Sequence, residues 1–143
     1  MYDKVGNSVI VDMSEIGRRN PGLFEREVCS MSMNLPHTKD NERLALSELK
    51  RRVRAQTAIE QVVVFGSVAR GEATEESDLD VLVVTKEPVS YLVETAIFDI
   101  AFFINIEYDT NISVLVVPKD KWESPVWSLL PLHQAIMREG VAV

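Results

Sequence analysis

The apolar positions along the chain follow two periods, which predict helices and buried strands. Between 40 and 56, apolar residues recur at spacings of three and four, so a helix is expected there, capped by Asp40 or Asn41. Uninterrupted runs of apolar and β-branched residues predict buried strands at 62–65, 79–84 and 112–117.

The later part of the chain predicts further helices. Pro88 suits the first turn of a helix extending over Val89–Asn105, where the apolar face is broad. A last helix is expected at 132–138, ending before Gly140 as a C-cap. Gly66 to Ser77 predicts a turn with a possible short helix. An apolar cluster is expected from Trp122, Val126, Trp127, Leu129 and Leu130.

This order of elements predicts an α/β (α+β) domain, with a small mixed β-sheet and flanking helices. We expect the domain at 39–143. Residues 1–38 contain several glycines and prolines and little apolar sequence, which predicts a weakly structured N-terminal extension. A length of 143 residues suits a single domain with one core.

The charge balance argues against broad, non-specific nucleic-acid binding. The net charge is −7, from 15 basic and 22 acidic residues, whereas such binding requires a cationic surface. One basic segment, 50–54, has two interpretations: the solvated face of a helix, or a local surface for RNA or an acidic protein.

Other features of the composition favour a cytoplasmic protein. No apolar run approaches the roughly 20 residues of a membrane span, and the N-terminus lacks the pattern of a signal peptide. The single cysteine, Cys29, permits no intrachain disulfide.

The candidate chemistry lies between the first two predicted strands. Gly66-Ser67 ends one strand, and Asp78-Leu79-Asp80 opens the next after ten intervening residues. Residues at i and i+2 of a strand point to the same face, roughly 6.6 Å apart. Two carboxylates in this arrangement repel each other unless a cation lies between them, so the spacing favours a divalent metal and a nucleotide.

Nucleotidyl transfer depends on positioning and on neutralising phosphate charge, which Mg²⁺ does well. Asp78 and Asp80 are the candidate metal ligands. Gly66 permits close approach of the backbone to a phosphate, and Ser67 adds an N–H and a hydroxyl donor. Arg70 lies one turn later, within reach of a phosphate.

The twenty residues 65–84, FGSVARGEATEESDLDVLVV, resemble the core of minimal nucleotidyltransferases of the DNA polymerase beta-type superfamily. They are close to the antitoxin members of MNT–HEPN toxin–antitoxin pairs, and the likeness extends over roughly 40–143. The resemblance implies Mg²⁺, ATP or another nucleoside triphosphate, and transfer of a nucleoside monophosphate to a hydroxyl of a HEPN-type toxin. It also implies that Gly66 and Ser67 hold the triphosphate, while Asp78 and Asp80 hold the metal.

The chain departs from this family at one position. Active members carry a third acid on the third strand, where this sequence has Ser113 between apolar residues. Asp109, just before that strand, is the candidate replacement, and Glu107 is another. Their alternative interpretation is that of solvated loop acids.

The leading hypothesis is therefore a Mg²⁺-dependent enzyme that transfers AMP from ATP to a partner protein. A second hypothesis, motivated by Ser113, is a weak or inactive module that neutralises a toxin by binding it. Transfer to a small molecule is a third, which the short length disfavours.

Overall fold

The computed structural model describes residues 2–5, 8–11, 35 and 38–143. Near the N-terminus, β1 (Tyr2–Val5) and β2 (Ser8–Val11) form an antiparallel pair. Most of the predicted extension, including Cys29, lies outside the described residues. Leu35 is 1% exposed and belongs to the core, although it precedes the predicted domain boundary at residue 38.

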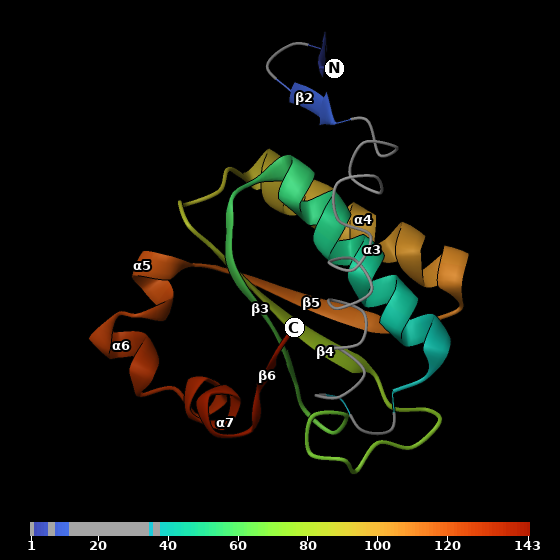
Figure 1. Ribbon diagram of the computed structural model, residues 1–143. Coiled ribbons are helices and arrows are strands. Elements are labelled where there is room, and N and C mark those ends of the chain that lie inside the picture. Colours follow the sequence, from blue (N-terminus) through green and yellow to red (C-terminus); the bar gives the residue numbers. More distant parts are fainter. Residues whose placement is uncertain (1, 6–7, 12–34, 36–37) are drawn as a thin grey trace.

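The remaining elements alternate between helices and strands (Figure 1). They are α3 (Asp40–Gln56), β3 (Ile59–Phe65), β4 (Leu79–Thr85), α4 (Tyr91–Tyr108), β5 (Ile112–Pro118), α5 (Lys119–Trp122), α6 (Pro125–Ser128), α7 (Pro131–Glu139) and β6 (Val141–Ala142). The predicted strands and long helices are all present.

The four-stranded sheet is mixed, as predicted. Its order is β5-β4-β3-β6, with β3 antiparallel to both β4 and β6, and β4 parallel to β5. The parallel pair requires a crossover connection, which α4 provides. β6 was not predicted, because a strand of two residues carries no readable periodicity.

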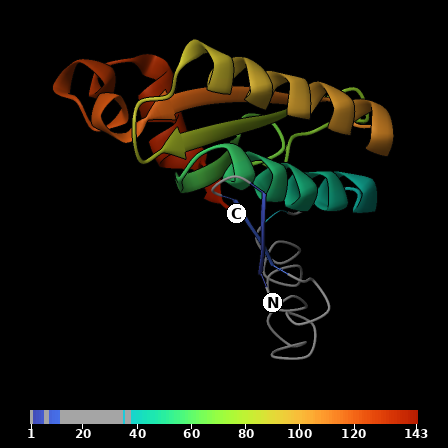
Figure 2. The ribbon, with the colours of Figure 1, turned by 90° about the horizontal axis from the view of Figure 1, so that it is seen from above.

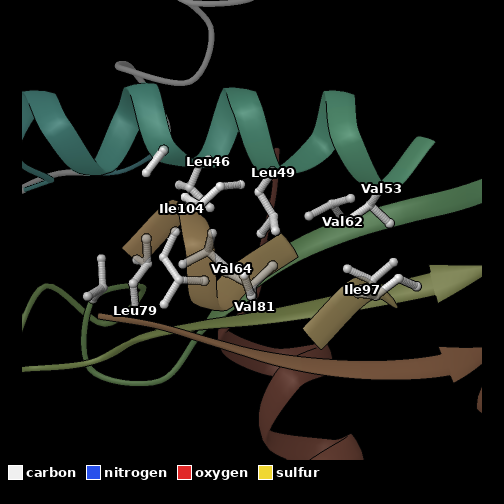
Figure 3. Packing of buried hydrophobic residues seen from close by; sticks show 14 of the residues in the cluster. Leu46, Leu49, Val53, Val62, Val64, Leu79, Val81, Ile97 and Ile104 are labelled. Atoms are coloured by element: carbon white, nitrogen blue, oxygen red, sulfur yellow. The ribbon is translucent and has the colours of Figure 1, made fainter. Parts of the chain in front are cut away.

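Helices cover both faces of the sheet. On one face, α3 and α4 lie side by side and bury one apolar cluster against alternate strand residues (Figures 2 and 3). The labelled members are Leu46, Leu49, Val53, Val62, Val64, Leu79, Val81, Ile97 and Ile104. The other face packs against α5 and α7 through Val63, Leu82, Val84, Val117, Trp122 and Ile136. This alternation is expected of strands buried on both faces.

The helix starts differ from the predictions. Helix α3 is capped at Lys39, whose N–H donates to the Glu42 carboxylate at 2.8 Å, so Asp40 is already helical. Helix α4 begins after Ser90, whose hydroxyl accepts from the Val93 N–H, and not at Pro88. Both helices therefore begin where a side-chain oxygen accepts a hydrogen bond from a backbone N–H that has no partner within the helix.

Two further predictions were wrong in part. Residues 66–77 form turns and no regular helix. In the predicted aromatic and aliphatic cluster, Trp122 is buried and its ring lies tilted beside that of Trp127. The remaining members are exposed: Val126, Leu129 and Leu130. The last helix is one residue longer at each end than predicted, and Gly140 caps it in an extended conformation. Among the described helices, none has the length and apolarity required to span a membrane.

Candidate active site

The Gly66-Ser67 turn and Asp80 meet where β3 ends and β4 begins. Phe65, the last residue of β3, lies directly opposite Asp80 in the antiparallel pair. The connection formed by residues 66–78 thus returns the chain beside its own starting point. The sheet register therefore brings the predicted phosphate-binding turn and one predicted metal ligand together.

Gly66 is required by this geometry. Its φ of +78° lies in the left-handed region, which side chains other than glycine rarely adopt. A Cβ built on Gly66 would overlap Oδ2 of Asp80. Glycine therefore permits both the turn and the close approach of the backbone to the carboxylate.

Backbone hydrogen bonds hold the turn in a compact shape. The Arg70 N–H donates to the Gly66 carbonyl at 3.2 Å, and the Glu72 N–H donates to the Ser67 carbonyl at 2.9 Å. Gly71 follows with a φ of +72°. This second left-handed residue ends the helical turn and explains why no short helix forms here.

The Arg70 guanidinium lies beside the turn but is engaged in ion pairs. It donates to Glu72 at 3.0 Å and to Glu139, at the end of α7, at 3.2 Å. These hydrogen bonds raise the pKa of Arg70. Arg70 also acts on Asp80, whose pKa its positive charge lowers.

The Asp80 carboxylate is half-buried and its pKa lies above the usual value. Burial is the largest cause, followed by the negative charge of Asp78; Arg70 opposes both. A cation bound between the two acids would reverse this destabilisation of the charged form. The electrostatics thus favour a positively charged ligand at Asp78 and Asp80.

Asn111 is a site residue that the sequence reasoning missed. The side-chain amide of Asn111 donates to Oδ1 of Asp78, and the backbone carbonyl of Asn111 accepts from the Leu79 N–H at 2.9 Å. The next residue, Ile112, is held by the side-chain amide of Asn105. The amide oxygen accepts from the Ile112 N–H at 2.7 Å, and the amide nitrogen donates to the Ile112 carbonyl at 2.9 Å. These contacts fix the entry to β5 against Asp78. Asn111 and Asp78 are 33 residues apart in the sequence, so no local sequence pattern indicated their contact.

Ser113 lies next to Asp80 on β5. The two residues pair in register in the parallel β4–β5 ladder, so their side chains point to the same face of the sheet. This is where the resemblance places a third acid. The register therefore confirms that a hydroxyl stands beside Asp80 on the neighbouring strand.

Asp109 occupies a different kind of position. It caps the C-terminus of α4 with a φ of +52°, is exposed, and its carbonyl accepts from the Asn41 amide at 3.0 Å. Within 38–143, no three acidic, histidine or cysteine side chains are placed to hold a metal ion. The structure thus does not group Asp109 with Asp78 and Asp80, and its catalytic role stays a prediction.

The available donors suit a magnesium ion that arrives with a nucleotide. Mg²⁺ is commonly held by one or two carboxylates, with the remaining positions filled by substrate phosphates and water. Asp78 and Asp80 supply two carboxylates. Burial and then the charge of Asp78 raise the pKa of Asp80, and a bound cation would offset both effects. An all-protein metal cage does not fit these residues.

Arg51 and Arg52 of the basic segment at 50–54 form ion pairs with nearby acids. Glu48 binds both Arg51 and Arg52 at 2.6 Å, and Arg52 also reaches Glu107 at 2.8 Å. The two guanidinium groups lower the pKa of Glu48 to about 2. Glu107 is thereby engaged with α3, and these arginines form a charge network on the helix surface.

Comparison with known proteins assigns the chain to a family. The nucleotidyltransferase domain family matches residues 46–140. A Methanocaldococcus jannaschii protein, provisionally named a protein adenylyltransferase, is 30% identical over 105 residues, covering 70% of this chain and 95% of that protein. A second protein of that organism with the same kind of name is 39% identical over 61 residues, covering 43% of this chain and 62% of its own length.

Among solved structures, a variant of the toxin–antitoxin MntA–HpeT superposes with a TM-score of 0.50 at 19% identity, covering 73% of this chain and 72% of that one. At this identity the likeness concerns the fold alone. Together with the glycine turn held against Asp80, the family match over residues 46–140 leads to one conclusion: the chain belongs to the nucleotidyltransferase domain family and is a nucleotidyltransferase.

Proposed function

We propose that the protein transfers AMP from Mg²⁺-bound ATP to a hydroxyl of a partner protein. The observation that carries this proposal is the contact of the Gly66 turn with Asp80, beside Asp78. A phosphate chain at the turn would lie next to both carboxylates. The protein adenylyltransferase name of the 30%-identical relative supports the choice of AMP and of a protein acceptor.

In this reaction, the acceptor oxygen forms a bond to the α-phosphorus of ATP while the bond to the bridging oxygen breaks. Pyrophosphate leaves, and the proton of the acceptor hydroxyl passes to solvent. Asp78 and Asp80 would hold magnesium, which neutralises charge on the phosphate oxygens. Gly66 and Ser67 would bind the triphosphate through backbone N–H groups and a hydroxyl. Asn111 would hold the Asp78 carboxylate in one orientation.

The acceptor that we propose is a toxin of the HEPN class. The resemblance of residues 65–84 to antitoxin members supports this, and a fold neighbour is itself named as part of a toxin–antitoxin pair. The single cysteine supports a cytoplasmic site of action.

The proposed AMP transfer is tested with ATP that carries a radiolabel at a known phosphate. The protein is incubated with Mg²⁺ and a HEPN protein encoded beside it, using ATP labelled at either the α- or the γ-phosphate. Label from the α-position alone should reach the toxin, because AMP transfer releases the γ-phosphate in pyrophosphate. Asp78→Ala and Asp80→Ala should each reduce transfer by about 100-fold or more. Glu76→Ala, an exposed acid in the same loop, is the matched control.

Ser113 favours a second candidate function. Without a third acid beside Asp80, the domain would bind ATP and neutralise its partner through complex formation alone. No label would then reach the toxin, and the variant lacking both Asp78 and Asp80 would still neutralise it. Loss of neutralisation in that variant, with the complex still formed, would exclude this alternative.

A further inference from the structure

Helix α4 carries a second apolar face that packs against no other described element. Its inner face buries Ile97, Ala101 and Ile104 against the sheet. Its outer face exposes large apolar side chains at helical spacing: Tyr91 is 80% exposed, Leu92 78%, Phe98 45%, Phe102 60%, Phe103 60% and Ile106 66%. In Figure 2, α4 forms one edge of the molecule. A helix that is apolar on all sides is normally buried on all sides.

The contrast with α3 shows that this face is unusual within the same fold. α3 packs on the same side of the sheet, but its outward positions carry charged residues, among them Glu48, Arg51 and Arg52. The polar residues on the outer face of α4 are Thr95 and Asp99. The Thr95 hydroxyl donates to the Tyr91 carbonyl at 2.8 Å, so this hydrogen-bond donor is already satisfied within the helix.

Asp99 is the charged group of this face and lies near its middle. It is exposed and is placed midway between Tyr91 and Ile106 along the helix. The sequence from 87 to 118 contains no lysine, arginine or histidine. The face therefore combines exposed aromatic and aliphatic side chains with a central negative charge.

We propose that the outer face of α4 binds a second protein through an apolar surface with one basic side chain opposite Asp99. Aromatic side chains and arginine are enriched at the energetic centres of protein interfaces. An arginine of the partner would pair with Asp99 among the apolar side chains of this face. A second copy of this chain fits poorly. A twofold axis through the middle of the face would bring two Asp99 carboxylates together, and like charges in an interface are unfavourable.

This inference does not depend on the proposed transfer reaction. On β4, Asp80 lies two and four residues before Leu82 and Val84, so its side chain points to the same face of the sheet. That face packs against α5 and α7. Helix α4 covers the opposite side. A protein bound to α4 would leave the catalytic acids uncovered, so binding should persist when Asp78 and Asp80 are replaced by alanine.

A pair of designed peptides tests the proposal on the full chain. Each is an amphipathic helix with one leucine and phenylalanine stripe; the first carries arginine in the middle of the stripe, and the second carries glutamate. The arginine peptide should bind the wild-type protein. Asp99→Lys should weaken that binding by about tenfold or more and should transfer the preference to the glutamate peptide. Phe102→Asp should abolish binding of both.

The control is Leu129→Asp, which alters an exposed apolar residue beyond α6, on the other side of the sheet. It should leave peptide affinity unchanged. Circular dichroism and thermal unfolding establish that each variant is folded. Equal affinity for both peptides in the wild type and in Asp99→Lys, or no binding at all, would overturn the proposal. A concentration-dependent dimer in ultracentrifugation that Phe102→Asp dissociates would assign the face to a second copy and would also overturn it.

Discussion

The ionisation of Asp80 depends on its burial and on the charges beside it. Burial and the charge of Asp78 raise its pKa above the ordinary 3.8. The folded, metal-free protein therefore binds this proton more tightly than the unfolded chain does. As pH rises through 3.8 and the raised value, the folded state loses stability relative to the unfolded state.

We therefore expect Asp80→Asn to stabilise the metal-free protein at neutral pH, raising the melting temperature by on the order of a few degrees. The gain should shrink as pH falls toward 3.8, because the wild-type carboxyl is then neutral as well. Thermal unfolding without metal between pH 4 and 8 measures this, with Glu76→Gln as the control. The same substitution should abolish stabilisation by Mg²⁺ and ATP. A destabilised variant would contradict the electrostatic account of the site.

Gly66 offers a second prediction at this scale. Gly66→Ala forces a side chain into the left-handed region, costing about 1–2 kcal/mol, and places its Cβ against Asp80. Gly71→Ala is the matched control, because Gly71 has a similar φ of +72°. Both variants should lose stability in urea, but Gly66→Ala should lose far more affinity for Mg²⁺ and ATP. Equal losses of affinity would assign Gly66 a purely conformational role.

At the scale of elements, the parallel pairing of β4 and β5 places Ser113 beside Asp80. Ser113→Asp would add a carboxylate to the face that Asp80 occupies. If acceptor activation is limited by the missing acid, transfer should rise by about tenfold or more. Ser113→Asn, similar in size but uncharged, is the control. The measurement is the initial rate of label transfer. An unchanged rate would indicate that another group already supports the acceptor.

The elements themselves were largely predictable, whereas the contacts between them were not. Uninterrupted apolar runs identified β3, β4 and β5, because both faces of this sheet are covered and polar alternation is absent. The glycine turn and Asp80 were also predictable, since their proximity depends on strands adjacent in sequence. Asn111 was not, because its contact with Asp78 arises from a parallel pairing across α4. Single-sequence patterns do not encode such register.

At the scale of the molecule, the C-terminal elements close the site from a distant part of the chain. β6 adds to the edge of β3, with Val64 opposite Val141, which holds the end of α7 beside the glycine turn. Glu139 at that end binds Arg70, 69 residues earlier. Arg70, the predicted phosphate ligand, thus donates to both Glu72 and Glu139. Bound triphosphate must compete with these two carboxylates.

This competition predicts that Glu139→Gln tightens ATP binding. The ion pair is exposed, and such pairs contribute little, so an increase in affinity of about 2–5-fold is expected. Glu87→Gln removes an equal charge at the opposite end of β4 and controls for the net charge of −7. The gain should vanish in an Arg70→Ala background, which a double-mutant cycle by titration calorimetry measures. A gain that persists without Arg70 would mean that Glu139 repels the phosphates directly, and that Arg70 is a structural link between the turn and α7.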